Sequence, residues 1–477
     1  MQTRLINRRQ LHDIMHSSAF NQNLDSSTKS LTRRATWVNM SDRRASLARL
    51  DSNYSSTTSQ DDGDVLQNTL RSILSPARLA ALDSVDVAPV PYNSYSFFSH
   101  IMSIHGRNLP MLITPLLSLF LWGLAWQLLF FYGLKDDNIY KEISDVQEYL
   151  ASMDDLITPL LTPLSFMLTF RLGRAAVRFW DARRAAGKMV EICRTNIATI
   201  SVGFMAPLRL RKRHMRNNQP QNSMTENEKN LAEKSERATD GEYAKDAEAL
   251  ELLCEYACWL AVFPIAVKHF LRPAKRPGWD MQVRLRKRRY EIGTLLLDDD
   301  ARRVIMEYDD KDGKPTSDST TGTRARDPPL VVLNRLHELA YDIAHFTYAG
   351  DGPTSYLPTP QGRAIFYQQT MDQINILFGA FGAMERIKGT PLPFAYAIHL
   401  RTFLLLYLVL WNMSSVAKYG WLSLPFLFLL NWALLGIEAA AVECERPFDY
   451  NPNHLTLGKV SVVVARNIGQ ALKELVR

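Results

Sequence analysis

The chain has 477 residues, of which 46% are apolar and 22% are charged, and its formal net charge is +7. A basic excess suits nucleic acid, anionic lipid or anionic solutes as partners. The lysines and arginines flank long apolar stretches and do not alternate with aromatic residues, so we expect a membrane protein without a nucleic-acid partner. The four cysteines form no disulfide framework and no CxxC pair, and Cys254 and Cys258 are expected to be buried thiols, with a metal site as the alternative.

The first part of the chain, residues 1–92, is expected to be a disordered tail or a transit segment. It is rich in Ser, Asn, Asp and Arg, and it has few apolar runs to offset the entropy of ordering. Its arginines, mixed with Ser and Thr, are typical of an organelle transit peptide, although a plain cytosolic tail explains the same composition. No apolar core of a secretory signal is present, so a cleaved signal of that kind is not expected.

Four apolar stretches predict an all-α membrane protein with four transmembrane helices per subunit. Residues 109–132 carry no charge and are long enough to cross a bilayer. Arg401 and Glu438 interrupt later stretches, and we interpret Arg401 as an anchor that reaches the interface, with an ion-binding role as the alternative. The other three predicted spans lie at about residues 156–170, 395–417 and 421–441.

The second span is short for a full crossing and runs into a strongly basic stretch, so one helix can carry both halves. The loop before it is acidic. Because positive charge favours the cytosolic side, we expect residues 171 onward and the N-terminus on the cytosolic or stromal-like side. Thr162, Phe166 and Phe170 stand at i, i+4 and i+8 and therefore share one helical face. We expect this face to line an ion pathway.

The chain between and after the two pairs of spans is expected to form a cytosolic helical bundle. One of its helices is apolar, but its uncharged run is only about a dozen residues, which favours a buried soluble helix over a span. Polar tracts at about 217–246 and 309–327 predict disordered insertions, and residues 451–477 are a C-terminal segment. The expected bundle helices are 171–205, 250–272, 328–346 and 365–387.

Several distinctive short runs of sequence lie between residues 95 and 470. The longest is MERIKGTPLPFAY, from Met384 to Tyr396. The others are Ser103–Gly106, Phe170-Arg171 with Arg178–Arg183, Val267–Arg272 and Glu443–Phe448. In their residues and in their order along the chain, these runs resemble the bestrophin family, including its bacterial and plant thylakoid-type members. The resemblance implies a bestrophin-like channel domain over residues 93–450.

The same resemblance implies a homopentameric anion channel with one central pore and a cytosolic helical vestibule. It places the narrow neck of the pore at Thr162, Phe166 and Phe170, where the polar Thr162 departs from the usual aliphatic residue. It places a second, cytosolic aperture at Ile365, for which an ordinary core position is the alternative.

Charged residues beside these positions bear on the ions involved. Arg171, Arg174 and Arg178 would raise the local anion concentration if they face the vestibule, and they could equally bind lipid phosphates or pair with Asp181. Animal members of the family bind calcium through an acidic cluster after the last Pro-Phe pair, but here only Asp449 follows. Because calcium prefers several carboxylate oxygens, no metal or other cofactor is expected.

The predicted function is therefore conduction of chloride or another small anion across a lipid bilayer. The alternatives are a non-conducting membrane scaffold and a bestrophin-like channel that prefers cations or bicarbonate. The sequence contains no nucleophile elbow, P-loop, paired catalytic carboxylates or zinc-ligand spacing, so an enzyme is not expected. The Arg- and Ser-rich start fits a plastid thylakoid, and a plasma-membrane location is the alternative.

Overall fold

The computed structural model describes residues 58–83, 109–133, 140–217, 226–272, 291–293, 295–296, 328–346, 360–450 and 453–476. Helices are the only regular elements in these ranges. In chain order they are α4 (Thr58–Ile73), α5 (Pro76–Asp83), α7 (Leu109–Gly133), α8 (Tyr140–Ser152), α9 (Asp154–Ile157), the 3₁₀ turn η1 (Thr158–Leu160), α10 (Leu161–Asn217), α11 (Glu226–Leu271), α14 (Pro328–His345), α15 (Pro360–Gly389), α16 (Phe394–Tyr419), the 3₁₀ turn η2 (Gly420–Leu422), α17 (Ser423–Glu445) and α18 (Leu457–Val476).

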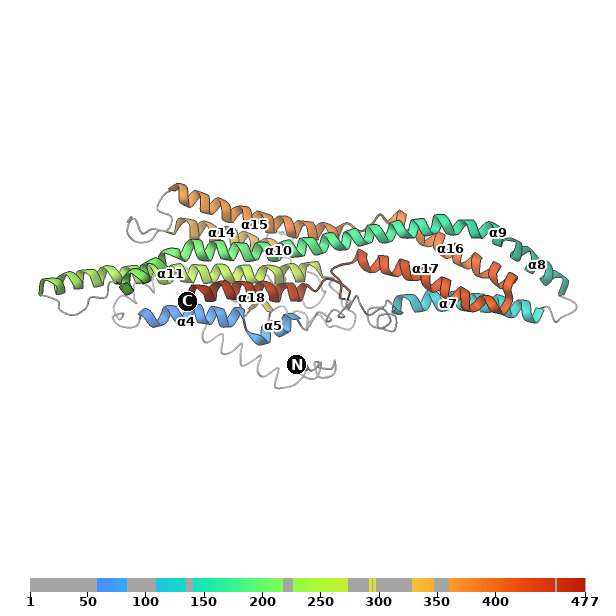
Figure 1. Cartoon of the computed structure of the whole chain (residues 1–477), viewed down its shortest axis with the longest axis horizontal. Coiled ribbons are helices and arrows are strands. Elements are labelled where there is room, and N and C mark those ends of the chain that lie inside the picture. Colours follow the sequence, from blue (N-terminus) through green and yellow to red (C-terminus); the bar gives the residue numbers. More distant parts are fainter. Residues whose placement is uncertain are drawn as a thin grey trace, which may run out of the picture.

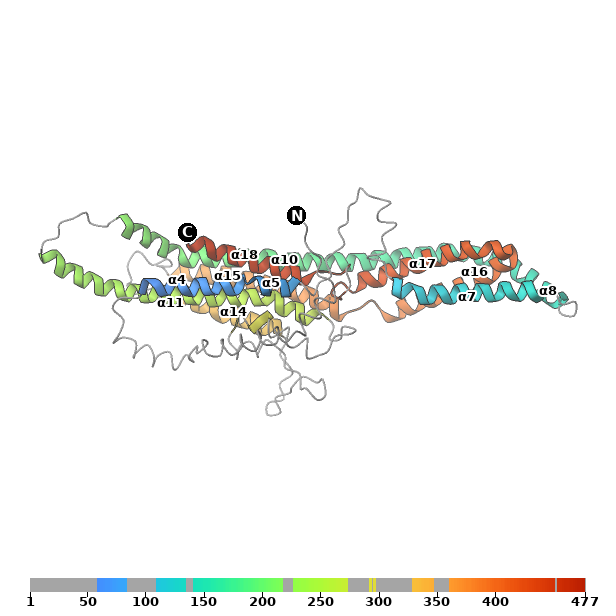
Figure 2. The same ribbon diagram turned by 90° about the horizontal axis from the view of Figure 1, so that it is seen from below.

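The helices gather into two ends that α10 joins (Figure 1). At the apolar end, α16 and α17 contact the start of α10, and α7, α8 and α9 pack against these two helices or against each other. At the bundle end, α11, α15 and α18 contact the rest of α10, and α4, α5 and α14 pack against these three helices. The view turned by 90° shows the same division into two ends (Figure 2). The 57 residues of α10 make a helix of about 85 Å, far longer than the roughly 30 Å of a bilayer's hydrocarbon core. One helix does carry both the apolar and the basic half, as the sequence predicted.

Helices long and apolar enough to cross a membrane occur at all the predicted spans. The stretches Leu112–Tyr132, Ser144–Gly203 and Phe394–Glu445 have apolar windows that are only 28%, 22% and 33% buried within the chain. The last of these stretches holds both α16 and α17. The stretch Ala247–Leu271 of α11 is as apolar but 72% buried, which fits a helix inside a soluble bundle. The described part of the chain is thus all-helical, and the chain is an integral membrane protein.

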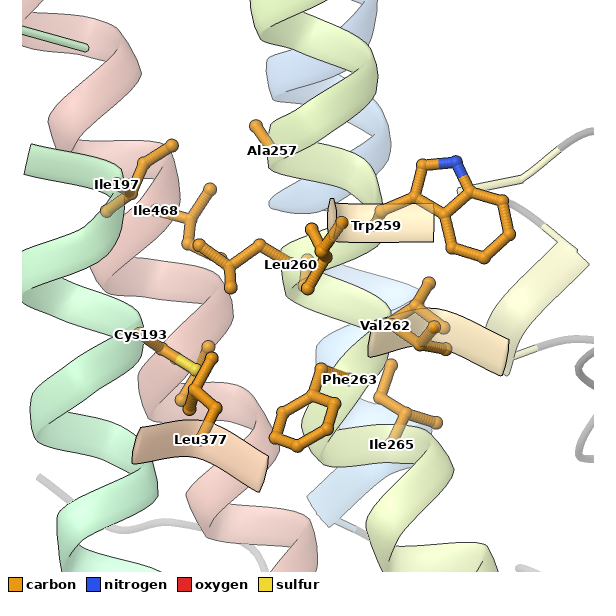
Figure 3. Packing of buried hydrophobic residues seen from close by; sticks show 14 of the residues in the cluster. Cys193, Ile197, Ala257, Trp259, Leu260, Val262, Phe263, Ile265, Leu377 and Ile468 are labelled. Atoms are coloured by element: carbon orange, nitrogen blue, oxygen red, sulfur yellow. The ribbon is translucent and has the colours of Figure 1, made fainter. Parts of the chain in front are cut away.

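Each end has a hydrophobic core of its own. In the bundle end, α11 runs through the centre and its side chains meet those of α10, α15 and α18 (Figure 3). Phe263, Leu377 and Ile468 are examples from three of these helices, each at most 1% exposed. In the apolar end, Leu168 of α10 packs in a separate cluster with Leu404 of α16.

Residues 58–83 correct the expectation of a disordered tail over residues 1–92, because they form α4 and α5. Leu66 and Ile73 lie two helical turns apart, and with Leu82 they are 6%, 0% and 0% exposed in the bundle core. The average composition misled because the few apolar residues here lie on one face, which docks against α11 and α18. Residues 1–57 and 84–92 lie outside the described residues.

Residues 226–246 correct most of the expected insertion at 217–246, because α11 begins at Glu226 and is helical throughout. Residues 218–225 lie outside the described residues. The tract at 226–246 is polar but rich in Glu, Lys and Ala, which are strong helix formers. The helix α10 itself begins at Leu161, because α9 and the proline-containing turn η1 precede it. The expected insertion at 309–327 and the Ser103–Gly106 run lie outside the described residues.

Candidate functional site

The row of residues expected to line an ion pathway lies on one outward face of α10. Thr162 is exposed, and Phe166 and Phe170 are 64% and 53% exposed. Their two rings meet edge to face, with centroids 4.4 Å apart and planes at 76°. The i, i+4, i+8 spacing therefore places the three side chains together, and both phenylalanines stay more than half exposed.

The same face continues beyond the apolar end into the bundle end. Val177, Trp180 and Val202 follow on it and are 58%, 57% and 61% exposed. The opposite face of α10 is buried, with Leu168 and Ala175 at 1% and 0%. Because large apolar side chains rarely stay exposed along a whole helix, this face is suited to contact with something outside the single chain.

Arg171 lies away from this face, although it directly follows Phe170. It is 0% exposed, and its Nε lies 2.6 Å from Oε2 of Glu438 while its Nη2 lies 3.2 Å from Oε1 of Glu445. Successive helical residues differ by about 100° in direction, so Arg171 turns toward α17 while Phe170 turns outward. The structure places Arg171 in the interior instead of on the expected vestibule wall.

Arg174 and Arg178 have different surroundings. Arg174 is exposed one turn after Phe170. Arg178 donates to three backbone carbonyl oxygens, those of Glu445 (Nε, 3.1 Å), Thr390 (Nη1, 2.5 Å) and Ile387 (Nη2). These carbonyls lie at or just after the C-terminal ends of α15 and α17, where intrahelical donors are missing. Burial lowers the pKa of Arg178, against the opposing effect of the nearby Glu445 carboxylate.

Asp181, the acid suggested as a partner for these arginines, pairs with Arg184 at 3.2 Å instead. This pair lies on the surface of α10, where the Arg184 and Asp181 side chains are 81% and 48% exposed. An exposed pair of this kind contributes little to stability.

Ile365 lies on α15, far from the two phenylalanines. It is 57% exposed, so it is not an ordinary core residue. The helices α10 and α15 run antiparallel, because Arg178 bonds near the end of α15 while Gln373 Nε2 donates to Thr199 Oγ1 at 3.1 Å. Thr199 lies about 45 Å from Phe170 along α10 at the usual helical rise, and Ile365 lies farther still. The structure separates the two expected narrowings by more than a bilayer's thickness.

Arg401 and Glu438, two charged residues of the apolar end, contact each other, and Glu438 also contacts Arg171. The sequence alone did not predict these contacts. Arg401 Nε donates to Glu438 Oε1 at 2.7 Å, so each carboxylate oxygen of Glu438 contacts a different arginine. In the sequence, Glu438 is recognisable only as an ionisable interruption of the last apolar stretch. The available signal was a pair of opposite charges in two neighbouring spans, since ionisable groups in a membrane usually pair with each other.

Both distinctive sequence runs lie against α10. The MERIKGTPLPFAY run is the elbow between α15 and α16, where Thr390 accepts from Arg178 and the Tyr396 hydroxyl donates to the Met167 carbonyl at 3.4 Å. The Glu443–Phe448 run ends α17 and supplies Glu445 to Arg171. Both runs therefore fix the position of α10 at the level where it leaves the apolar end.

A match with a known protein family lies in the part of the chain that contains these two runs. Residues 357–470 match the family model described as "Bacterial/Fungal Bestrophin protein". A "Voltage-dependent anion channel-forming protein" of Nostoc sp. is 42% identical over 104 residues, which cover 21% of this chain and 34% of that protein. A protein of the same description from Synechocystis sp. is 32% identical over 95 residues, covering 20% and 31%. The chain thus spans about a third of the length of these curated relatives.

Among solved structures, the chain is similar to a bacterial bestrophin homolog from Klebsiella pneumoniae, with a TM-score of 0.48 and 16% identity, over 76% of this chain and 98% of that one. The family match at 357–470 contains the MERIKGTPLPFAY and Glu443–Phe448 runs. The resemblance to the bestrophin family that these runs indicated is therefore confirmed over this segment of the chain.

Proposed function

We propose that this protein is an anion channel in which five copies surround one central pore lined by the exposed face of α10. The observation that carries the proposal is the row of outward side chains that starts at Thr162 and continues to Val202. The row lies on a helix that is much longer than a bilayer. A ring of such helices would cover these apolar faces and continue the pathway from the membrane into the cytosol.

The neck of this pore would be formed by Phe166 and Phe170 from every copy, with Thr162 one turn closer to the outer side. An apolar ring can gate by losing its water and needs no strong ion-binding site. Aromatic edges carry partial positive charge, so edges that point into the pore favour a poorly hydrated anion over a cation. Phe166 and Phe170 already meet edge to face within one chain.

Positive charge on the cytosolic side of the neck would raise the local concentration of anions. Of the three expected arginines, Arg174 alone has an exposed side chain on the outward part of α10, so we assign the attraction to Arg174. Arg178 acts mainly as a cap for helix ends, and Arg171 acts inside the chain. Ile365, exposed on α15, is the proposed cytosolic aperture.

The choice of anions is supported by the relatives, since the matching proteins of Nostoc sp. and Synechocystis sp. carry the name of anion channel-forming proteins. Chloride is the proposed ion, and no enzymatic activity is proposed. A plastid thylakoid or a plasma membrane remains the proposed location, and a fluorescent fusion of residues 1–95 distinguishes the two.

Reconstitution into liposomes with a chloride-flux assay tests the proposal, and the reversal potential under a salt gradient gives the selectivity. We expect chloride flux and a reversal potential close to that of chloride. The mass of the purified protein in detergent tests the pentamer. Absence of flux at every voltage and calcium concentration would favour the membrane scaffold, and a reversal potential close to that of the cation would favour the cation channel.

The neck is tested by the double variant Phe166→Ala/Phe170→Ala, which is expected to widen the constriction and raise the single-channel current. A matched control is Phe426→Ala, since Phe426 is 67% exposed at the apolar end but lies on α17. Unchanged current and halide permeability in the double variant would remove the neck assignment. An equal change in the control would show that the effect is not specific to the face of α10.

A further inference from the structure

A four-residue charge network fixes the pore-lining helix at the level of the proposed neck. Arg171 of α10 lies between Glu438 and Glu445, which stand two turns apart on the same face of α17. Arg401 of α16 takes the second oxygen of Glu438 at 2.7 Å. Glu438 therefore joins three helices of the apolar end with one carboxylate.

The network is balanced in charge, and three of its four side chains are largely buried, while that of Arg401 is 50% exposed. The side chains of Arg171 and Glu438 are 0% and 8% exposed, and that of Glu445 is 19% exposed. Two arginines face two glutamates, so removal of either carboxylate leaves a positive charge without compensation. For the fully buried Arg171 such a loss is severe, because the stranded charge keeps its cost of burial.

The network also lies directly beside the neck rings in the chain. Arg171 follows Phe170 directly, so any rotation of α10 that moves the guanidinium away from α17 also moves the ring. Its two contacts along α17 oppose both rotation and sliding of α10, because one guanidinium must reach two carboxylates two turns apart. A planar arginine fork is suited to this, whereas a lysine offers one point charge.

We propose that Glu438 is a positioning residue for the neck, and that through Arg171 it sets the direction of the Phe166 and Phe170 rings in the pore. This inference rests on the proposed channel function. Glu438 itself does not line the pathway, since it is buried against α10 and α16. Its effect on permeation must therefore pass through the rings.

A double-mutant cycle tests this dependence. Glu438→Gln keeps the size of the side chain and removes its charge, and it is measured in the wild-type chain and in the Phe166→Ala/Phe170→Ala background. We expect a change of about twofold or more in the iodide-to-chloride permeability ratio in the wild-type chain, which is the lower end of couplings between contacting residues. In the background without the rings, the same substitution is expected to leave the ratio unchanged.

Asp154→Asn is the matched control. Asp154 is also a mostly buried carboxylate of the apolar end, with an 11% exposed side chain paired to Lys418 at 2.5 Å, but it does not contact the network. Any effect of this substitution is expected to be the same with and without the rings. If Glu438→Gln gives no monodisperse protein, Arg171→Lys replaces it in the cycle.

Two results would overturn the inference. One is an unchanged permeability ratio in well-assembled Glu438→Gln protein, and the other is an equal change in both backgrounds. Either of these leaves the proposed channel intact, because the wild-type protein still conducts. A wild-type protein that carries no chloride current is a separate failure, that of the proposed function itself.

Discussion

Leu74, in the turn between α4 and α5, fills a notch on α18 that exists because residue 469 is a glycine. A Cβ atom added to Gly469 would lie 2.7 Å from both Cγ and Cδ2 of Leu74, a separation that real side chains do not show. The α4–α5 pair and α18 therefore meet at a position where any side chain would force Leu74 to shift.

Gly469→Ala is expected to push α4 and α5 away from the bundle and to destabilise it by about 1–3 kcal/mol, the usual effect of overpacking. The midpoint of thermal unfolding should fall, and protease should cut α4 and α5 faster. The second-site change Leu74→Ala should restore part of the loss. Gly187→Ala on α10 is the control, since a Cβ there meets nothing within 4 Å. An unaltered midpoint for Gly469→Ala would contradict the notch.

The paired amides of Asn412 and Asn431 are expected to hold α16 against α17 inside the membrane. Each Nδ2 lies 3.4 Å from the other's Oδ1, and the two residues are 1% and 0% exposed. We expect Asn412→Ala and Asn431→Ala to be non-additive, with a coupling of about 0.6 kcal/mol, typical of polar pairs between membrane helices. Unfolding of both single variants and the double variant measures it, with the exposed Asn375→Ala as control. Strict additivity would show that the pair contributes nothing.

Arg178 is expected to be a structural cap whose fork shape matters more than its charge. Arg178→Lys keeps the charge but cannot reach the carbonyls of Ile387, Thr390 and Glu445 together. Each lost bond contributes about 0.5–1.5 kcal/mol, so a clear fall in the unfolding midpoint is expected. Arg184→Lys is the control, because that side chain is 81% exposed on the same helix. Equal midpoints for both variants would refute the capping role.

The buried thiols are expected to resist alkylation in the native protein. Burial raises the pKa of Cys193 to about 12 and that of Cys254 to about 11, in the second case against a hydrogen bond with Thr69. Both thiols therefore stay protonated at pH 8, and the thiolate is the reactive form. Iodoacetamide labelling followed by mass spectrometry should modify them only after unfolding. Rapid labelling of Cys193 in folded protein would show that the bundle core opens readily.

Local patterns in the sequence were enough to predict several features. Long uncharged runs predicted the helices of the apolar end, since the hydrocarbon thickness dictates their length. The spacing of Thr162, Phe166 and Phe170 predicted their shared face, because helix geometry alone decides it. The short uncharged run in α11 predicted a buried soluble helix, which its 72% burial fits.

The tertiary structure decided what each charged residue of α10 does. Arg171 and Arg174 are alike in sequence, yet one is buried between carboxylates and the other is exposed. That difference depends on α17, whose Glu438 and Glu445 come from a distant part of the chain. Docking against α11 and α18 likewise ordered α4 and α5, although their composition predicted disorder. Periodicity is a local property that sequence determines, whereas the partners of a charge and the burial of a weakly apolar face depend on which helices pack together.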